Sequence, residues 1–250
     1  MSTNGERPDP LSRLQTVSEA IESLGAIFAA EEPLDDVLLR VADTAARAVP
    51  GADAVSITVL SDPEPRTAAC TDDLMLGLDR EQYTAGRGPC LEAAQTRQAV
   101  RVSTDVEQQR WPEFVAAARQ QGVLASLSSP LIVAPAHDED EGELVGSLNI
   151  YSRSTAAFDP FDDLLVRLYT VTASQAITNA RRWQSSRETV TQLEAALNSR
   201  SVIDQAKGAV RTRTGCTADE AFATLVDLSQ RKNIKLRDVA QQLLDKYPER

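Results

Sequence analysis

The chain has 250 residues, which is room for one large domain or two smaller ones, and 42% of them are hydrophobic, as in an ordinary folded protein. A formal net charge of −11 and three widely spaced cysteines, with no CxxC pair, exclude a uniformly basic nucleic-acid-binding protein, a disulfide framework and a cysteine-based zinc site. No apolar run approaches the roughly 18 residues of a membrane span, and the N-terminus has no apolar signal segment, so we expect a cytoplasmic protein.

The first part of the chain alternates helical and strand patterns. Residues 1–10 are polar and include two prolines, so we expect a disordered tail there. Beyond it, apolar residues spaced three and four apart predict helices, and β-branched runs between turn residues predict strands. In chain order, the expected elements are helices at 11–28 and 34–49, a strand at 54–60, a turn at 62–65, a strand at 66–71 and a short helix around 74–78.

The middle of the chain completes a sheet. The expected elements are a strand at 99–102, a helix at 111–119, and a hairpin of strands at 126–133 and 143–151 around the acidic loop 138–142. The pattern is helical from Pro160 onward. This order fits an α+β fold in which an antiparallel sheet carries helices on one face.

One long helix is expected to connect this domain to the C-terminal part. Between Asp162 and Arg213 there is no proline, and Gly208 is the only glycine. The apolar residues follow spacings of three and four in a stripe narrow enough for a coiled-coil seam, which would pair two chains in a homodimer. The alternative is a helix that folds back onto its own sheet.

The last fifty residues have the opposite charge balance. From Arg200 onward there are 10 basic and 7 acidic residues, against 16 and 30 before it, and all four lysines lie in this tail. Apolar periodicity predicts three short helices. The first ends at Gly215, Thr217 and Glu220 form a capping box for the second, and Asn233 ends the second. A basic module on an acidic body indicates a polyanion-binding element.

This tail resembles the ANTAR domain, a three-helix RNA-binding module of transcription antitermination regulators. The resemblance rests on the strings Ile203-Asp204-Gln205-Ala206-Lys207-Gly208, Thr217-Ala218-Asp219-Glu220-Ala221-Phe222, Ser229-Gln230 and Lys235-Leu236-Arg237-Asp238-Val239-Ala240. It implies binding to paired hairpin loops of nascent RNA, which prevents a terminator from forming. It also implies a homodimer, because the family's RNA target has two stem-loops.

Basic groups and the Ala-Lys-Gly step are the candidates for RNA contact, because lysine and arginine meet both phosphates and unstacked bases. The expected RNA-binding residues are Ala206, Lys207, Gly208, Arg211, Arg213, Arg231, Lys232, Lys235 and Arg237. Phe222 is interpreted as a core residue. For each cation the alternative is an ordinary solvated charge.

The preceding region resembles a GAF domain of the kind found before ANTAR modules in actinobacterial regulators. The matching strings are Val49-Pro50-Gly51-Ala52-Asp53, Tyr83 with Gly86-Arg87-Gly88-Pro89-Cys90-Leu91, Arg110-Trp111-Pro112, and Val145-Gly146 with Leu148-Asn149-Ile150-Tyr151-Ser152. The resemblances imply a sensory domain at 11–181, a helical linker at 182–199 and an RNA-binding domain at 188–249. The fold implies a sensory role but names no ligand or cofactor.

The sequence leaves open whether this domain binds a small molecule. The candidate pocket residues are Cys90, Glu92, Trp111 and Ser129, each with a packing role as its alternative. We interpret Gly86-x-Gly88 as a tight turn rather than a phosphate cradle, because no strand-to-helix setting surrounds it. His137 is the only histidine and lies beside the acidic loop, so we expect no metal or haem site.

The sequence favours a regulator over an enzyme. It has no HExxH, Walker loop or serine–histidine–aspartate arrangement. Two alternatives stay open. One is a GAF-based redox or ligand-binding enzyme whose C-terminal helices only dimerise, and the other is a DNA-binding regulator.

Overall fold

The computed structural model describes residues 8–25, 32–60, 64–133 and 142–246. The chain divides into two compact units, Met1–Gln184 and Ser185–Arg250. The helix α6 (Pro160–Thr214) contributes to both, so the single long helix expected from the sequence is confirmed.

The N-terminal unit is built around a five-stranded antiparallel sheet with the strand order β2-β1-β5-β4-β3. The hairpin of β4 and β5 is the one expected from the sequence, and it joins β3 to the other strands. The strands are β1 (Ala54–Val59), β2 (Arg66–Cys70), β3 (Val100–Ser103), β4 (Ala125–Val133) and β5 (Glu143–Ser152). The α+β fold class is therefore confirmed.

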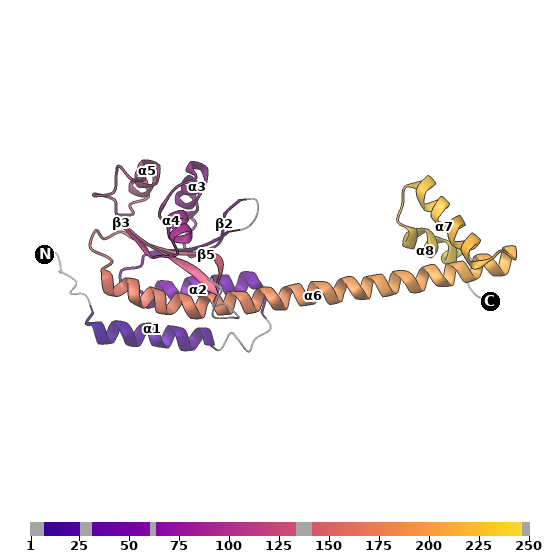
Figure 1. Ribbon diagram of the computed structural model, residues 1–250, viewed down its shortest axis with the longest axis horizontal. Helices are drawn as coiled ribbons and strands as arrows, with labels where there is room; N and C mark the ends of the chain where they lie inside the picture. Colours follow the sequence, from indigo (N-terminus) through magenta and orange to yellow (C-terminus); the bar gives the residue numbers. More distant parts are fainter. Residues whose placement is uncertain (1–7, 26–31, 61–63, 134–141, 247–250) are drawn as a thin grey trace. The chain divides into compact units, whose positions relative to one another are not determined.

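Helices cover both faces of this sheet, and the expectation of helices on one face is wrong (Figure 1). The helices α1 (Pro10–Gly25), α2 (Leu34–Ala48) and the first part of α6 lie on one face, and α3 (Met75–Ala85), α4 (Pro89–Thr96) and α5 (Pro112–Gln120) lie on the other. The physical reason is visible in β1, where all six residues are buried. A strand of a sheet that faced water on one side would bury only alternate residues.

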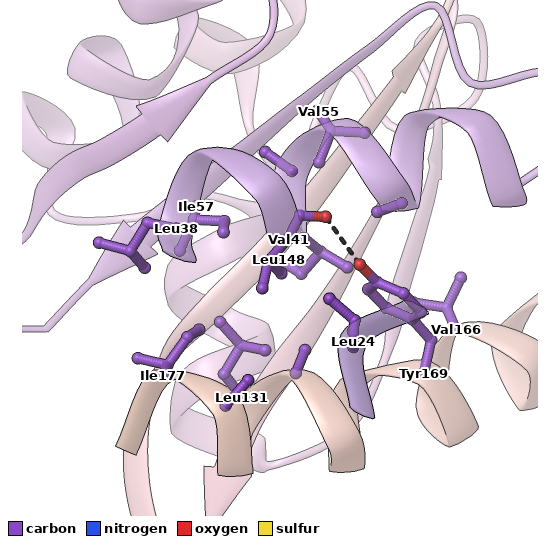
Figure 2. Close-up of a cluster of buried hydrophobic side chains, with 14 of the residues drawn as sticks. Leu24, Leu38, Val41, Val55, Ile57, Leu131, Leu148, Val166, Tyr169 and Ile177 are labelled. Carbon is purple, nitrogen blue, oxygen red and sulfur yellow. Dashed lines mark hydrogen bonds between the residues drawn. The ribbon is translucent and has the colours of Figure 1, made fainter. Parts of the chain in front are cut away.

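The larger core fills the space between the sheet and the helices α1, α2 and α6. In Figure 2, Ile57, Leu131 and Leu148 of the sheet share this cluster with Leu38 of α2 and Ile177 of α6. In this cluster the Tyr169 hydroxyl donates to the Val41 carbonyl oxygen at 2.7 Å, which satisfies the buried hydroxyl and ties α6 to α2.

The start of α6 is fixed by Asp159, which precedes Pro160. Its carboxylate accepts from the Phe161 amide at 2.8 Å, and a proline at the first helical position is typical of helix starts. Arg13 of α1, only 5% exposed, donates to Asp159 at 3.1 Å and also to Asp162, which is itself buried. The guanidinium of Arg13 lies over the Phe161 ring as well. These contacts hold α1 against the beginning of α6.

The C-terminal unit packs the end of α6 against α7 (Ala218–Lys232) and α8 (Leu236–Lys246). Thr217 and Glu220 form the predicted capping box: the Thr217 Oγ1 accepts from the Glu220 amide at 3.3 Å, and Glu220 accepts from the Thr217 amide at 2.8 Å. Asn233 ends α7 in the left-handed conformation with a φ of 52°. The three-helix bundle expected from the resemblance is confirmed.

Some expectations fall outside the described residues. These are most of the tail at 1–10, most of the turn at 62–65, the acidic loop with His137, Phe28 and the residues beyond Lys246. Of the expected tail, Pro10 already begins α1.

Candidate functional site

The end of α6 carries an exposed cationic face. Lys207 and Arg211 are four residues apart, so they lie on the same side of the helix. Lys207 is half-buried and its Nζ lies 3.0 Å from the Asp204 carboxylate, while Arg211 is exposed. Ion pairs this exposed are weak in water, so a phosphate can compete with Asp204 for Lys207.

Gly208 opens a gap on this face. It lies inside the helix and is exposed, and a Cβ added there would have no atom within 4 Å. A glycine in a helix interior costs about 1 kcal/mol relative to alanine. No packing within the described part of the chain requires that cost.

Two of the expected RNA-binding residues lie elsewhere on the helix. Ala206 is fully buried in the bundle core with Ala221 and Leu225, where its small size lets α6 and α7 approach. Arg213 is exposed but two positions past Arg211, about 200° further around the helix axis. The structure therefore groups Lys207, Gly208 and Arg211 without these two.

The remaining cations gather around the turn between α7 and α8. Arg231 and Lys232 form the last turn of α7, and Lys235 and Arg237 stand at the start of α8; all four are exposed. Arg231 donates to Asp227 at 3.0 Å on its own helix. Within the described residues the structure records no salt bridge for the other three, which leaves their charges to solvent or a ligand.

The four candidate ligand residues of the N-terminal unit do not form one pocket. Cys90 and Trp111 are buried on the α3–α5 face of the sheet, and half-buried Glu92 is paired with Arg110, which stacks on Trp111 at 4.3 Å. Ser129 is paired with Leu148 in the sheet and therefore belongs to the opposite face. There it lines a groove of about 680 Å³ together with Arg97 and Asp163.

A buried polar network lies between the sheet and α3, and the sequence patterns do not predict it. Asp79 of α3 is fully buried and accepts from the Tyr151 hydroxyl and, at 2.9 Å, from the Thr67 hydroxyl. Burial raises the pKa of Asp79, and the hydrogen bonds oppose that rise. Asn149 donates to Thr58 at 2.9 Å on the same face. The signal in the sequence was the alternation of polar residues within strands that turn out to be covered.

Several polar atoms of this interior lack a partner. Among the described residues, the Gln82 Nε2, Ser126 Oγ, Ser147 Oγ and Asn149 Oδ1 atoms are buried without a hydrogen bond. Buried polar groups are normally satisfied by protein, water or a ligand. These four atoms therefore have unused hydrogen-bonding capacity.

The two glycines near Cys90 form a turn between helices rather than a phosphate cradle. Gly86 ends α3 with a φ of 63°, a left-handed conformation that favours glycine. At Gly88, which precedes α4, a Cβ would lie 2.4 Å from the Gln82 side-chain oxygen. That oxygen accepts from the Cys90 amide at 3.0 Å, so Gln82 occupies the space where a phosphate would bind.

Over the described ranges, no cluster of three or more histidine, cysteine, aspartate or glutamate side chains is arranged to hold a metal ion. No described helix combines the length and hydropathy that a membrane span needs.

Comparison with known families assigns both units. The sequence model of the GAF domain family matches residues 31–178, more than half of the chain. The chain belongs to the GAF domain family. The ANTAR domain model matches residues 191–244, so this GAF protein carries an ANTAR domain at its C-terminal side. The helix α1 lies before the GAF match, although Arg13 binds it to the GAF unit.

Solved structures share the fold of the GAF unit. One is a free methionine-R-sulfoxide reductase from Neisseria meningitidis in complex with its substrate, 18% identical, covering 72% of this chain and 98% of its own, with a TM-score of 0.52. Another is the GAF domain of a phosphoenolpyruvate-protein phosphotransferase from Coxiella burnetii, 18% identical, covering 69% and 98%, with a TM-score of 0.50. Among curated proteins none matches this chain. At these identities the likeness shows the fold alone.

Proposed function

We propose that this protein is a cytoplasmic RNA-binding transcription antitermination regulator. In this proposal the ANTAR domain binds paired hairpin loops of a nascent transcript and so prevents terminator formation, and the GAF domain controls that binding. The observation that carries the proposal is the face of α6 where Lys207 and Arg211 flank the exposed Gly208 within an ANTAR domain.

The direct test is to crosslink the protein to cellular RNA and sequence what is recovered. Enrichment of twin-hairpin leaders upstream of terminators supports antitermination. Binding to such an RNA and to duplex DNA at equal salt then separates this function from that of a DNA-binding regulator, since both ligands gain from the same phosphate charge. Preference for the DNA would contradict the proposal.

Replacing Gly208 by alanine is expected to stabilise the ANTAR domain and weaken its RNA binding. The open space around the Cβ position leaves about 1 kcal/mol of helix propensity to be gained. The added methyl group would obstruct a close ligand, and we expect affinity to fall by about tenfold, or 1.4 kcal/mol. Thermal unfolding and RNA titration measure the two effects.

Gly77 of α3 offers a matched control for this substitution. It is also an exposed helical glycine with no atom within 4 Å of an added Cβ. Gly77→Ala should stabilise the GAF domain without changing RNA affinity. Unchanged RNA affinity in Gly208→Ala would contradict the proposed close approach.

We also propose that two chains pair along α6. Residues 184–198 are exposed throughout, and Val190, Leu193 and Leu197 lie there at spacings of three and four. That spacing is typical of a coiled-coil seam, and a dimer would present two ANTAR domains to two hairpins. Each of these three apolar residues is more than half exposed, so the single chain leaves most of their surface to solvent or to a partner.

Replacing Leu193 and Leu197 together by glutamate is therefore expected to yield a monomer. We expect the dissociation constant of the dimer to rise by about a hundredfold, because each chain would bring two charges into an apolar seam. Sedimentation velocity measures the change, and Gln192→Glu adds a charge off the seam as a control. A wild-type chain that sediments as a monomer, with and without RNA, would refute the pairing.

We propose that the sensor acts from the interior around Asp79 and Asn149, where unpaired polar atoms support binding of a small polar effector. The continuous helix α6 is the candidate coupling element, because it begins in the GAF unit and ends in the ANTAR unit. Coupling of this kind requires an element with two states that both sites bias.

A regulatory rather than catalytic role is supported by the cysteines. Burial raises the pKa of the Cys70 thiol to about 11 and raises that of Cys90 as well. Because the thiolate is the reactive form, neither group is activated as a nucleophile at neutral pH. We therefore propose that this chain shares the fold of a methionine sulfoxide reductase without sharing its redox chemistry.

A further inference from the structure

Phe222 lies outside the core that its position in the sequence predicts for it. Phe222 is 43% exposed, although its neighbour Ala221 and Leu225 of the same helix are fully buried. The apolar cluster of the ANTAR bundle is formed without it. The interpretation of Phe222 as a core residue is therefore wrong, because it lies about 100° around α7 from Ala221.

The exposed ring lies beside the cationic face of α6. The Lys207 Nζ is 5.9 Å from the centre of the Phe222 ring, so the ring and the ammonium group form one surface feature. Gly208 follows Lys207 directly, and Arg211 lies one turn further along α6. A flat apolar surface thus adjoins the Lys207 ammonium group, on a helix that also carries Gly208 and Arg211.

This combination fits an unpaired nucleobase better than a protein partner. Bases in RNA loops are splayed out and stack on aromatic side chains, while their phosphates contact lysine and arginine. A stable protein interface buries about 800 Å² on each side, far more than one half-exposed ring supplies. The surrounding charge also favours a polyanion.

We propose that Phe222 is a stacking platform for one unpaired base of the RNA loop, with Lys207 holding the adjacent phosphate. This inference rests on the proposed RNA-binding function and adds a specific position to it. In this arrangement Phe222 contacts a base, whereas Lys207 neutralises the charge of the RNA backbone.

A double-mutant cycle tests the platform. The probe is a twin-hairpin RNA selected for binding to the wild-type protein from a pool with randomised loops, together with versions that carry one abasic nucleotide at each loop position in turn. Phe222→Leu should lower affinity for the intact RNA by about ten- to a hundredfold, as expected for the loss of one base stack, whereas Phe222→Trp should retain it. At one abasic position, Phe222→Leu should cause no further loss.

The possible results distinguish failure of base stacking on Phe222 from failure of RNA binding by the protein. Phe222→Leu binding as tightly as wild type, or losing the same factor at every abasic position, overturns the platform and leaves RNA binding standing. Thermal unfolding of the variant shows whether a uniform loss comes from the fold. If the wild-type protein selects no RNA from the pool, the proposed function fails and the platform fails with it.

Discussion

Arg13→Ala should lower the free energy of unfolding of the GAF unit by about 3 kcal/mol, the size expected when one partner of a buried ion pair is removed. Arg13 and Asp162 are both buried, with side chains that are 5% and 2% exposed. Without the guanidinium, Asp162 would keep a buried charge without its cation, and α1 would lose its attachment to the start of α6. Chemical denaturation monitored by circular dichroism measures the change.

The pH dependence of this effect tells the ion pair apart from simple loss of packing. The hydrogen bonds from Arg13 hold the pKa of Asp159 well below its usual range. A carboxyl group with a lowered folded pKa contributes stability that is present above its unfolded pKa, about 3.9, and is lost as pH falls through the folded value. The difference between wild type and Arg13→Ala should therefore be largest near neutral pH and shrink below about pH 4.

Leu11→Ala is the matched control on the same helix, because Leu11 is 77% exposed. It should change stability little at any pH. A difference between wild type and Arg13→Ala that stays constant down to strongly acidic pH would assign the effect to packing against Phe161 instead of to charge.

The sequence predicted the elements whose signals are local. The long α6, the capping box at Thr217 and the end of α7 at Asn233 follow from helix periodicity and cap chemistry, which act over a few residues. The second helical layer on the sheet was not predicted. The helix α4 has only eight residues, which is too short for a clear periodic pattern. The polar side chains of Ser56 and Thr58 are typical of a sheet face exposed to solvent, but in the structure both residues are buried.

The sequence predicted which part of the chain is basic, but not which candidate residues share one surface. The lysine-rich tail indicates a cationic module. Ala206 is expected to bind RNA only through the Ala-Lys-Gly resemblance, although its spacing of four from Val202 and from Val210 places it on the buried face. The sequence predicts strands near both Ser129 and Cys90, but strand pairing places Ser129 on the other face of the sheet. Assigning a residue to a face requires the register, which depends on contacts far apart in sequence.

Replacing Lys207 and Arg211 together by alanine is expected to weaken binding of a twin-hairpin RNA by about a hundredfold. Each charge-assisted hydrogen bond to a phosphate contributes about 1.5 kcal/mol, and two lost contacts correspond to that factor. Because both residues lie on one exposed face of α6, the substitution leaves the core of the ANTAR bundle intact. Alanine also has a high helix propensity, so the midpoint temperature of thermal unfolding should not fall.

The salt dependence of RNA binding tests this prediction more specifically than the loss of affinity alone. Each phosphate contact to single-stranded RNA adds about 0.7 to the slope of the logarithm of affinity against the logarithm of salt, so the double variant should lose about 1.4. A charge-matched control is Arg200→Ala with Lys246→Ala, which removes the same net charge from other exposed positions. If both double variants lose the same affinity and the same slope, the RNA responds to the overall charge of the module and the α6 face is not its binding site. A loss confined to Lys207 and Arg211 places the phosphates beside Gly208, where a missing side chain lets the backbone of a loop approach the helix.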